Sequence, residues 1–477
     1  MKQIIQAALD TSFKGRIIQV TEALDRADAV SNQLIELDRV FSAMGFDSII
    51  ASKWHHEDVS SYRVNLDDVY ITESDIVIFH SCGYTEHSGP WAARQYCTKV
   101  ILYHNITPHE LFSEDSDLYK FCKLGREQLA EFVPQFHYFW GDSQYNLDEL
   151  IELGARPDRS FVVPIVVPPA PLVSFNLSTR KIPGNWVFLG RVASNKGQVD
   201  LVRLFARARK RNPDAAKHLT IVGGFNPSDD YYNRLLSEIA QLGLTQDVTI
   251  TGKVSDERRE QYLREAQFYV ALSVHEGFGV PLVEAPLRGL PVLALDRAAA
   301  RETMGGIGLH DDEDSLLQAL FALRGNDSDY QDLVKAQAAN ASRFTRSSVS
   351  EKLACALASI LPVKGFYKSV SVVICTYNRR DYLARCLDYL QCQSNPNFEV
   401  IVIDGPSDDG TKELLDSWRG RIKIAENGLR NLSISRNLGI ELSQGDIVAF
   451  IDDDAIPFDN WIDRILEEYN SRPLLTK

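Results

Sequence analysis

The sequence lacks several features that would place the protein outside the ordinary globular class. No apolar run in its 477 residues approaches the roughly 20 residues that span a bilayer. The opening stretch MKQIIQAALDTSFKG has no continuous apolar core like that of a secretory signal peptide, because Gln6 and Asp10 interrupt it. Both absences predict a cytoplasmic protein, with peripheral attachment at the inner face of the cell membrane as an open alternative.

Paired cysteines and an excess of basic charge are also missing. The seven cysteines are scattered, odd in number and without a CxxC pair, which indicates reduced thiols rather than a disulfide framework. The 65 acidic residues outnumber the 51 Lys and Arg residues, so the net charge is −14. Because proteins that bind nucleic acid usually carry a basic surface, we expect no nucleic-acid partner.

Short β-branched runs such as DIVIFH, KVILYH, NWVFLG and LTIVGG alternate with amphipathic helical stretches along the chain. This alternation predicts parallel sheets covered by helices, the α/β class. Two breaks interrupt it: a proline-rich linker near residues 166–182, and PVKGFYKS at 362–369. We expect α/β domains at 1–172 and 173–345, a returning helix at 346–362, a linker at 363–368 and a further unit at 369–477.

Two glutamates in the stretch HEGFGVPLVEAP form the leading candidate site. Glu276 follows the predicted strand FYVALSV, and Glu284 lies on the short helix that begins after the turn Gly277-Phe278-Gly279. Ligands bind at the carboxyl ends of strands in open α/β sheets, and the N–H groups of such a turn and helix start favour a phosphate. Since carboxylates accept hydrogen bonds from neighbouring sugar hydroxyls, the pair suits a ribose and a transferable sugar on either side of a phosphate.

The cations that such a site needs occur upstream, in NWVFLGRVASNKGQ. Gly190-Arg191 ends a predicted strand and Lys196 precedes a helix, so both side chains can neutralise a diphosphate leaving group. Gly223, in LTIVGGF, lets backbone approach a ligand closely. Two glutamates on a solvated loop and helix are the plain alternative, and the pairing of GRxxxxKG with EGFGxPxxEA favours the site.

The motifs GRVASNKG, IVGG, VTITGKVS, HEGFGVPLVEA and GLPVLA resemble, in order and spacing, those of glycosyltransferase family 4 over roughly residues 15–360. That family is retaining and has the GT-B fold, two Rossmann-like domains facing a cleft. The resemblance implies that Glu284 binds the nucleotide ribose, Glu276 holds the donor sugar, and Arg191 and Lys196 clamp the pyrophosphate. It also implies that the leaving phosphate takes the acceptor proton, without a metal or other cofactor.

The first domain carries further stretches that resemble this family. Ala27-Asp28-Ala29 stands where the family loop usually reads glycine-aspartate-alanine. ILYHNITP, KLGREQL and GDSQYNLDELIELG resemble a subset of the family, in which a histidine matching His104 contacts the donor sugar. We therefore expect His104 to act with Glu276, and a structural histidine capping a strand is the alternative. His80 is more often structural.

The helical stretch RLFARARKR at 203–211 is locally basic. It could contact anionic lipid or a lipid-linked acceptor. A solvated helix face is the favoured interpretation, because most charge runs on helices are of that kind.

The last unit contains a second set of motifs: CTYNR, DGPSDDGT, SRNLG and the triplet Asp452-Asp453-Asp454 at the end of an apolar strand. Consecutive acids at a strand end suit Mg²⁺ or Mn²⁺ that bridges a nucleotide diphosphate. These motifs resemble the first half of glycosyltransferase family 2, an inverting family with the GT-A fold. The resemblance implies nucleotide contacts by Thr376, Tyr377, Asp404 and Arg436, and metal contacts by Asp452 and Asp454.

The sequence ends at Lys477, soon after this triplet. We therefore expect the last unit, as a fragment of a longer bifunctional enzyme or as a vestigial domain, to bind nucleotide without completing a transfer. For the whole chain we expect a retaining glycosyltransferase that moves a sugar from a GDP-, UDP- or dTDP-sugar to a glycan or lipid-linked acceptor, in polysaccharide or O-antigen-type biosynthesis. A sugar-nucleotide epimerase, a phosphorylase and a non-enzymatic sugar-nucleotide-binding scaffold are the alternatives.

Overall fold

The computed structural model describes residues 13, 15–25, 28–168, 181–361 and 367–471. These residues form two compact units: unit 1 runs from Gly15 to Ser359 and unit 2 begins at Ile360. Each unit is described by itself. Unit 1 contains two parallel sheets and unit 2 contains one, so the predicted α/β class is confirmed.

The first sheet of unit 1 has, among the described residues, seven parallel strands in the order β3-β2-β1-β4-β5-β6-β7. Central strands such as IVIFHS and TKVILY are buried along their whole length because helices cover both faces. The strands are β1 (Ile17–Leu24), β2 (Ser48–His55), β3 (Arg63–Asn65), β4 (Ile76–Ser81), β5 (Thr98–Tyr103), β6 (Tyr138–Gly141) and β7 (Ser160–Val162). The α-helices are α2 (Ala29–Ala43), α3 (Ser88–Ala93), α4 (Asp117–Phe132) and α5 (Gln144–Glu152).

The second sheet of unit 1 has the order β10-β9-β8-β11-β12-β13 and is again parallel throughout its described strands. Its core is a single apolar cluster in which strand residues such as Phe188 and Phe268 pack against helix residues such as Phe205. The strands are β8 (Asn185–Leu189), β9 (His218–Val222), β10 (Val248–Ile250), β11 (Phe268–Ala271), β12 (Val292–Leu295) and β13 (Leu309–His310). The α-helices are α6 (Gln198–Arg211), α7 (Asp230–Gln241), α8 (Asp256–Glu265), α9 (Val280–Glu284), α10 (Ala300–Met304) and α11 (Glu313–Gly325).

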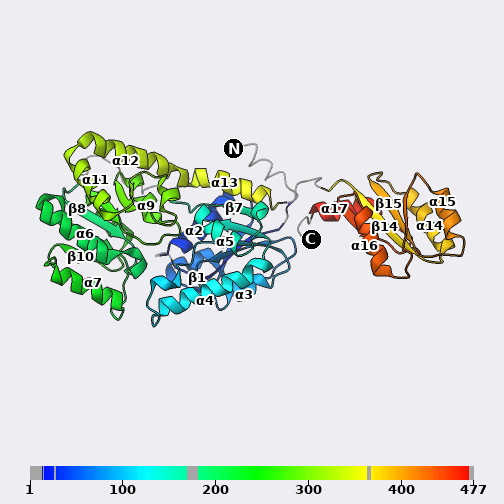
Figure 1. The fold of residues 1–477 in the computed structure, drawn as a ribbon, viewed down its shortest axis with the longest axis horizontal. Helices are drawn as coiled ribbons and strands as arrows, with labels where there is room; N and C mark the ends of the chain where they lie inside the picture. Colours follow the sequence, from blue (N-terminus) through cyan, green and yellow to red (C-terminus); the bar gives the residue numbers. More distant parts are fainter. Residues whose placement is uncertain (1–12, 14, 26–27, 169–180, 362–366, 472–477) are drawn as a thin grey trace. The chain divides into compact units, whose positions relative to one another are not determined.

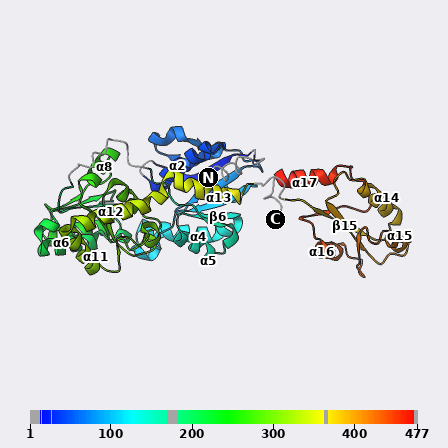
Figure 2. The same ribbon diagram turned by 90° about the horizontal axis from the view of Figure 1, so that it is seen from above.

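Two helices at the end of unit 1 join its halves. Helix α12 (Asp327–Ala341) packs on the second sheet, and α13 (Arg346–Ala358) lies beside α2 of the first half, as Figures 1 and 2 both show. The Arg346 guanidinium contacts Glu36 Oε2 at 2.6 and 2.8 Å, and Tyr138 Oη donates to the Ser359 carbonyl at 3.1 Å. Helix α13 therefore ties the end of unit 1 to its first half.

Unit 2 has a parallel sheet of the order β16-β15-β14-β17 among its described residues. Buried strand residues such as Val372 and Val402 pack against Leu383 and Leu387 of the first helix. The strands are β14 (Val370–Thr376), β15 (Phe398–Asp404), β16 (Lys423–Glu426) and β17 (Ile447–Phe450), and the helices are α14 (Arg380–Gln391), α15 (Thr411–Ser417), α16 (Leu432–Leu442) and α17 (Trp461–Ser471).

Short 3₁₀ helices complete the connections. They are η1 (Glu57–Tyr62), η2 (Leu66–Asp68), η3 (His109–Leu111), η4 (Val133–Gln135), η5 (Pro157–Arg159), η6 (Ser194–Lys196), η7 (Pro213–Ala215), η8 (Pro286–Arg288) and η9 (Ser342–Phe344). None of the helices among the described residues is both long enough and apolar enough to cross a bilayer.

Each sheet reverses its strand order at one place, between β1 and β4, between β8 and β11, and between β14 and β17. Ligands bind beyond the carboxyl ends of the strands at such switch points. The predicted boundary at 172/173 falls in residues 169–180 and most of the linker in 362–366, both outside the described residues.

Candidate active site

The loops after β8 and β11 meet at the switch point of the second sheet. Their strands are neighbours, with Phe268 opposite Trp186. Lys196 ends η6 in the first loop, and its Nζ lies 2.8 Å from Oε2 of Glu276 in the second. Both side chains are partly open to solvent, at 23% and 17% exposure. The structure therefore brings together two residues that the sequence places 80 positions apart.

Gly197 explains how the first loop fits beneath the second. Its φ is 68°, in the left-handed region, and a Cβ added there would lie 2.2 Å from the carbonyl oxygen of Leu272. A side chain at this position is excluded on both grounds. The glycine lets Lys196 turn toward Glu276 while α6 starts directly behind it.

The other predicted donor-binding glycines lie at strand ends or in the turn. Gly190 follows β8 and donates to Val222 O of β9 at 2.9 Å, and Gly223 follows β9. Arg191, next to Gly190, has an exposed side chain, and no hydrogen bond or ion pair of that side chain occurs within the described part of the chain. Its guanidinium is therefore free to meet a diphosphate.

The turn Gly277-Phe278-Gly279 leads into α9, which has Gly279 as N-cap and spans only Val280 to Glu284. The expected short helix is confirmed, since η8 follows at Pro286. Phe278 is buried, edge-on to Phe344 with ring centroids 5.1 Å apart, so it anchors the turn by packing. Its predicted part in donor binding is then limited to its backbone.

Glu284 is 7% exposed and ends α9. Its Oε1 lies 3.4 Å from a guanidinium nitrogen of Arg259, which comes from α8. Arg259 is not predictable from the sequence, because an arginine in the run ERRE carries no distinguishing signal. Glu276 and Glu284 thus each have one basic partner from a different element.

His104 lies just after β5 with its side chain 1% exposed. Its Nδ1 is 2.8 Å from Asp142 Oδ2 and its Nε2 is 2.9 Å from Nδ1 of His80. His80 in turn contacts Gln19 Oε1 at 3.2 Å, and burial lowers its pKa well below the usual value. Both ring nitrogens of His104 therefore have protein partners, which fits the alternative that His104 has a structural role. Its predicted contact with the donor sugar would need one of these bonds to break, and it stays a prediction.

Two minor sequence features find structural explanations. The basic helix stretch is paired within its own domain: Arg203 with Glu238, Arg207 with Glu313 and Arg209 with Asp247. These pairs fit the favoured interpretation of a solvated helix face. Asp28 is the N-cap of α2 and accepts from Ser31 N at 3.0 Å, whereas Ala27 lies outside the described residues.

In unit 2 the predicted residues gather at the carboxyl edge of β14, β15 and β17. Thr376 Oγ1 donates to Asp453 Oδ2 at 2.8 Å, and Asp404 lies opposite Thr376 in the neighbouring strand. Burial raises the pKa of Asp404, whose Oδ1 accepts from Ser407 Oγ at 2.7 Å. Polar side chains therefore line the switch point of the sheet of unit 2, between β14 and β17.

Three arginines surround this edge. Arg379, which the sequence analysis missed although it belongs to the CTYNR motif, contacts Asp453 at 3.1 Å and Asp454 at 2.7 Å. Arg430 stacks on Tyr377 at 4.1 Å from the ring centroid. Arg436 lies over the Phe450 ring at 5.6 Å, on the side of β17. The predicted roles of Tyr377 and Arg436 stay predictions.

The three aspartates of the triplet Asp452-Asp453-Asp454 differ in how far they are buried. Asp453 is 5% exposed, whereas Asp452 and Asp454 are exposed. No group of three or more His, Cys, Asp or Glu side chains suited to a metal occurs in the part of the chain that the structure describes. Mg²⁺ is commonly held by one or two carboxylates while phosphates and water complete its shell. The exposed carboxylates of Asp452 and Asp454 are therefore suited to hold Mg²⁺ or Mn²⁺.

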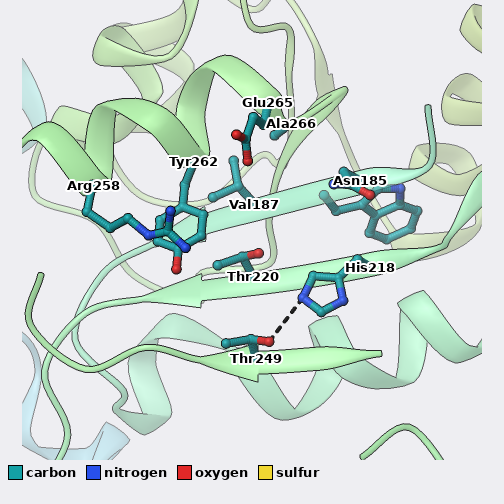
Figure 3. Close-up of a pocket in the computed structure, with 10 residues that line it drawn as sticks. Asn185, Val187, His218, Thr220, Thr249, Arg258, Tyr262, Glu265 and Ala266 are labelled. Carbon is teal, nitrogen blue, oxygen red and sulfur yellow. Dashed lines mark hydrogen bonds between the residues drawn. The ribbon is translucent and has the colours of Figure 1, made fainter. Parts of the chain in front are cut away.

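A separate pocket lies between α8 and the face of the second sheet (Figure 3). Asn185 and His218, the first residues of β8 and β9, line it together with Arg258, Tyr262 and Glu265 of α8. His218 Nε2 is 3.0 Å from Thr249 Oγ1. None of the predicted site residues lines this pocket, so it does not belong to the candidate site.

Two protein-family models match segments of the chain. Residues 183–326 match the model of Glycosyl transferases group 1, and residues 371–474 match that of Glycosyl transferase family 2. The two families occur in the predicted order, so the predicted resemblance is confirmed. Over these segments the chain matches glycosyltransferase families, and these matches together with the curated relatives support the predicted transferase enzyme.

Three curated relatives share parts of the chain. Glycosyltransferase AglE of Haloferax volcanii is 36% identical over 20% of this chain and 33% of its own length. D-inositol 3-phosphate glycosyltransferase of Nocardia farcinica is 32% identical over 43% and 49%. GDP-mannose:cellobiosyl-diphosphopolyprenol alpha-mannosyltransferase of Xanthomonas oryzae is 38% identical over 23% and 28%. The chain thus spans half or less of the length of each of these relatives.

Among solved structures, HepE of Anabaena in complex with UDP and glucose aligns with a TM-score of 0.55 at 17% identity, covering 72% of this chain and all of HepE. At this identity the likeness establishes the fold alone, which is the predicted GT-B arrangement. The family 2 match supports the GT-A assignment of unit 2.

Proposed function

We propose that unit 1 transfers a sugar from a nucleotide-sugar donor to an acceptor hydroxyl with retention of anomeric configuration. The observation that carries the proposal is the 2.8 Å contact between Lys196 and Glu276 at the switch point. In such a donor the sugar is bonded directly to the diphosphate. A cation for the phosphate and a carboxylate for the sugar must therefore lie within one contact of each other, as these two side chains do.

The remaining site residues support the same chemistry. The bond between the sugar C1 and the diphosphate oxygen breaks, a bond from C1 to the acceptor oxygen forms, and the acceptor proton passes to the leaving phosphate. Arg191 and Lys196 neutralise the charge that develops on the diphosphate, which is commonly the largest contribution to such a reaction. Glu276 and Glu284 accept hydrogen bonds from the sugar and the ribose. This division needs no metal in unit 1.

We propose a UDP-, GDP- or dTDP-sugar as donor and a glycan or lipid-linked acceptor, in polysaccharide or O-antigen-type biosynthesis. HepE is solved with UDP and glucose, and the Xanthomonas relative is named for GDP-mannose and a diphosphopolyprenol acceptor. Both names support these classes. They do not select among them, because specificity depends on a few pocket contacts.

For unit 2 we propose a nucleotide-binding site of the family 2 type, as part of a bifunctional enzyme. Its support is the polar edge built by Thr376, Asp404 and Asp453. Asp452 and Asp454 would hold Mg²⁺ or Mn²⁺, which neutralises diphosphate charge when bound. Arg379, already paired with Asp454, would orient that carboxylate.

The test for unit 1 is donor turnover by the full chain with a panel of UDP-, GDP- and dTDP-sugars. We expect one donor to be turned over, and Lys196→Gln to lower kcat by about 100-fold, because a cation on the leaving group is lost. Lys335→Gln is the matched control, since this lysine of α12 is 76% exposed. A wild type as inactive as Glu276→Gln, with donor binding retained, would instead support the sugar-nucleotide-binding scaffold.

A further inference from the structure

Three motifs of the first half carry polar residues, other than His104, that have no role in the proposed transfer: HNITP after β5, KLGREQL in α4, and GDSQYNLDELIELG from β6 into α5. In the structure their polar side chains converge. We call the set Asn105, Arg126, Ser143, Glu149 and His275 the junction, since it joins the first half of unit 1 to the HEGFG loop of the second.

Glu149 is the centre of the junction. Its Oε2 accepts from Tyr103 Oη at 2.8 Å and from Asn105 Nδ2 at 2.9 Å, and its Oε1 accepts from Arg126 at 3.2 Å. Arg126 also donates to the Ile106 carbonyl at 2.7 Å. The carboxylate therefore fixes three donors from three elements at once, and a fully satisfied polar network of this kind is rigid.

Asn105 is held in an unusual conformation by this network. Its φ is 72°, in the left-handed region that non-glycine residues seldom occupy. Its Nδ2 donates to both Glu149 and Asn146 Oδ1, at 2.9 and 3.1 Å. These two acceptors determine the orientation of the amide, because a flipped amide would point its oxygen at two other oxygens. Strained residues persist where surrounding contacts over-determine them, which is common at functional sites.

The free oxygen of this amide then reaches the second half of unit 1. Asn105 Oδ1 lies 2.7 Å from His275 Nε2. His275 is 6% exposed, and burial lowers its pKa to about 4, so the ring is neutral near pH 7 and carries its proton on Nε2. His275 directly precedes Glu276.

The residue on the other side of Glu276 is held from the first half as well. Ser143 Oγ donates to the Gly277 carbonyl at 3.0 Å. A Cβ added to Gly277 would lie 2.3 Å from Cβ of Asn105, so the glycine permits the close approach of the loop to the junction. Glu276 is thus flanked by two contacts that come from the opposite half of unit 1.

We propose that Asn105 is a positioning residue for the transfer: through the junction it places the HEGFG loop, and with it Glu276, against the bound donor sugar. The inference rests on the proposed function. Among the described residues no hydrogen bond or ion pair joins the side chain of Arg191, Lys196 or Glu284 to a side chain of the junction, so the phosphate and ribose contacts of the donor depend on it little. Loss of the junction should lower kcat and leave donor affinity nearly unchanged.

The test compares Asn105→Gly with Asn105→Ala in the full chain. Both remove the amide, but glycine accepts the positive φ and alanine does not. We expect both to lower kcat by about 100-fold, the cost of a misplacement near 1 Å, with donor Kd changed less than about 3-fold. Wild-type kcat in Asn105→Gly would overturn the proposal, because the residue would then serve only its backbone conformation. Asn233→Ala is the control, because Asn233 of α7 is exposed.

Amide hydrogen exchange gives a readout that needs no turnover. We expect Asn105→Gly to speed amide exchange in residues 275–279 and to leave exchange in residues 190–197 unchanged. We also expect slower exchange at 275–279 in His275→Gln than in His275→Ala, because glutamine keeps a donor for Asn105. Unchanged exchange at 275–279 in Asn105→Gly would overturn the positioning role. A wild type that turns over no donor would overturn the proposed function instead, and the exchange result would still decide whether the junction holds the loop.

Discussion

Glu276 is constrained from three directions: its carboxylate pairs with Lys196, and the residues before and after it contact the first half of unit 1. The carboxylate and its cation are predictable from the sequence because both stand in recognisable motifs at strand ends. The constraint is not predictable from the sequence, because His275 and Asn105 are 170 positions apart and their contact depends on how the two sheets pack. The same reason explains His104, whose burial by Asp142 and His80 is visible only in the fold.

The pKa of His275 leads to a prediction about acid stability. Burial lowers this pKa to about 4, whereas the unfolded chain titrates near 6.5. Between these values the unfolded state binds a proton that the folded state does not, so stability falls as pH drops from about 6.5 to about 4. The difference between these two pKa values corresponds to about 3 kcal/mol of folding free energy. Above pH 6.5 the ring is neutral in both states, so His275 causes no loss of stability there.

The measurement is urea unfolding of the wild type and of His275→Gln at pH 7 and pH 4. Glutamine keeps a donor for Asn105 and does not titrate. We expect the wild type to lose up to about 3 kcal/mol more than the variant between the two pH values. His80 titrates alike in both proteins and cancels in the comparison. Equal pH dependence would show that His275 is not held neutral.

At the scale of elements, the alternation of β-branched runs and helices was enough to predict parallel sheets, and the motif positions at strand ends were enough to predict the edges where sites form. The pairing of elements was not predictable to the same degree. Helix α8, for example, supplies Arg259 to Glu284 and Glu260 to the buried Arg288 at 2.6 Å. These contacts follow from the packing of α8 beside α9 and η8, which no local pattern encodes.

Arg259 provides a prediction at this scale. Helix α9 is five residues long, so Glu284 depends on a neighbouring element for its orientation. We expect Arg259→Gln to raise the donor Kd by about 3- to 10-fold, the range for one modest polar interaction, with kcat changed less than 2-fold. Isothermal titration and initial rates check this. Arg258→Gln is the matched control, since Arg258 lies on the same helix and pairs with Gln261 and Tyr262 instead.

At the scale of the whole molecule, the two units have separate apolar cores and separate switch points. Unit 1 offers cations to a diphosphate, namely Arg191 and Lys196, whereas unit 2 offers the exposed carboxylates of Asp452 and Asp454. Under the proposed function, cations of the protein would replace a metal in the first case and carboxylates would require one in the second. The two sites of one chain should therefore differ in their response to divalent ions.

A chelator distinguishes the site of unit 1 from that of unit 2. In excess EDTA we expect donor turnover that depends on Glu276 to stay within about 2-fold of its value with Mg²⁺, because Arg191 and Lys196 carry the phosphate charge. Binding of a nucleoside diphosphate to unit 2, followed as a metal-dependent rise in its melting temperature, should disappear, since ligand binding stabilises only the state that binds. The double variant Asp452→Asn, Asp454→Asn should abolish the same metal-dependent rise while leaving the turnover of unit 1 intact. Turnover by unit 1 that collapses in EDTA and returns with Mn²⁺ would contradict the assignment of its charge stabilisation to the two cations.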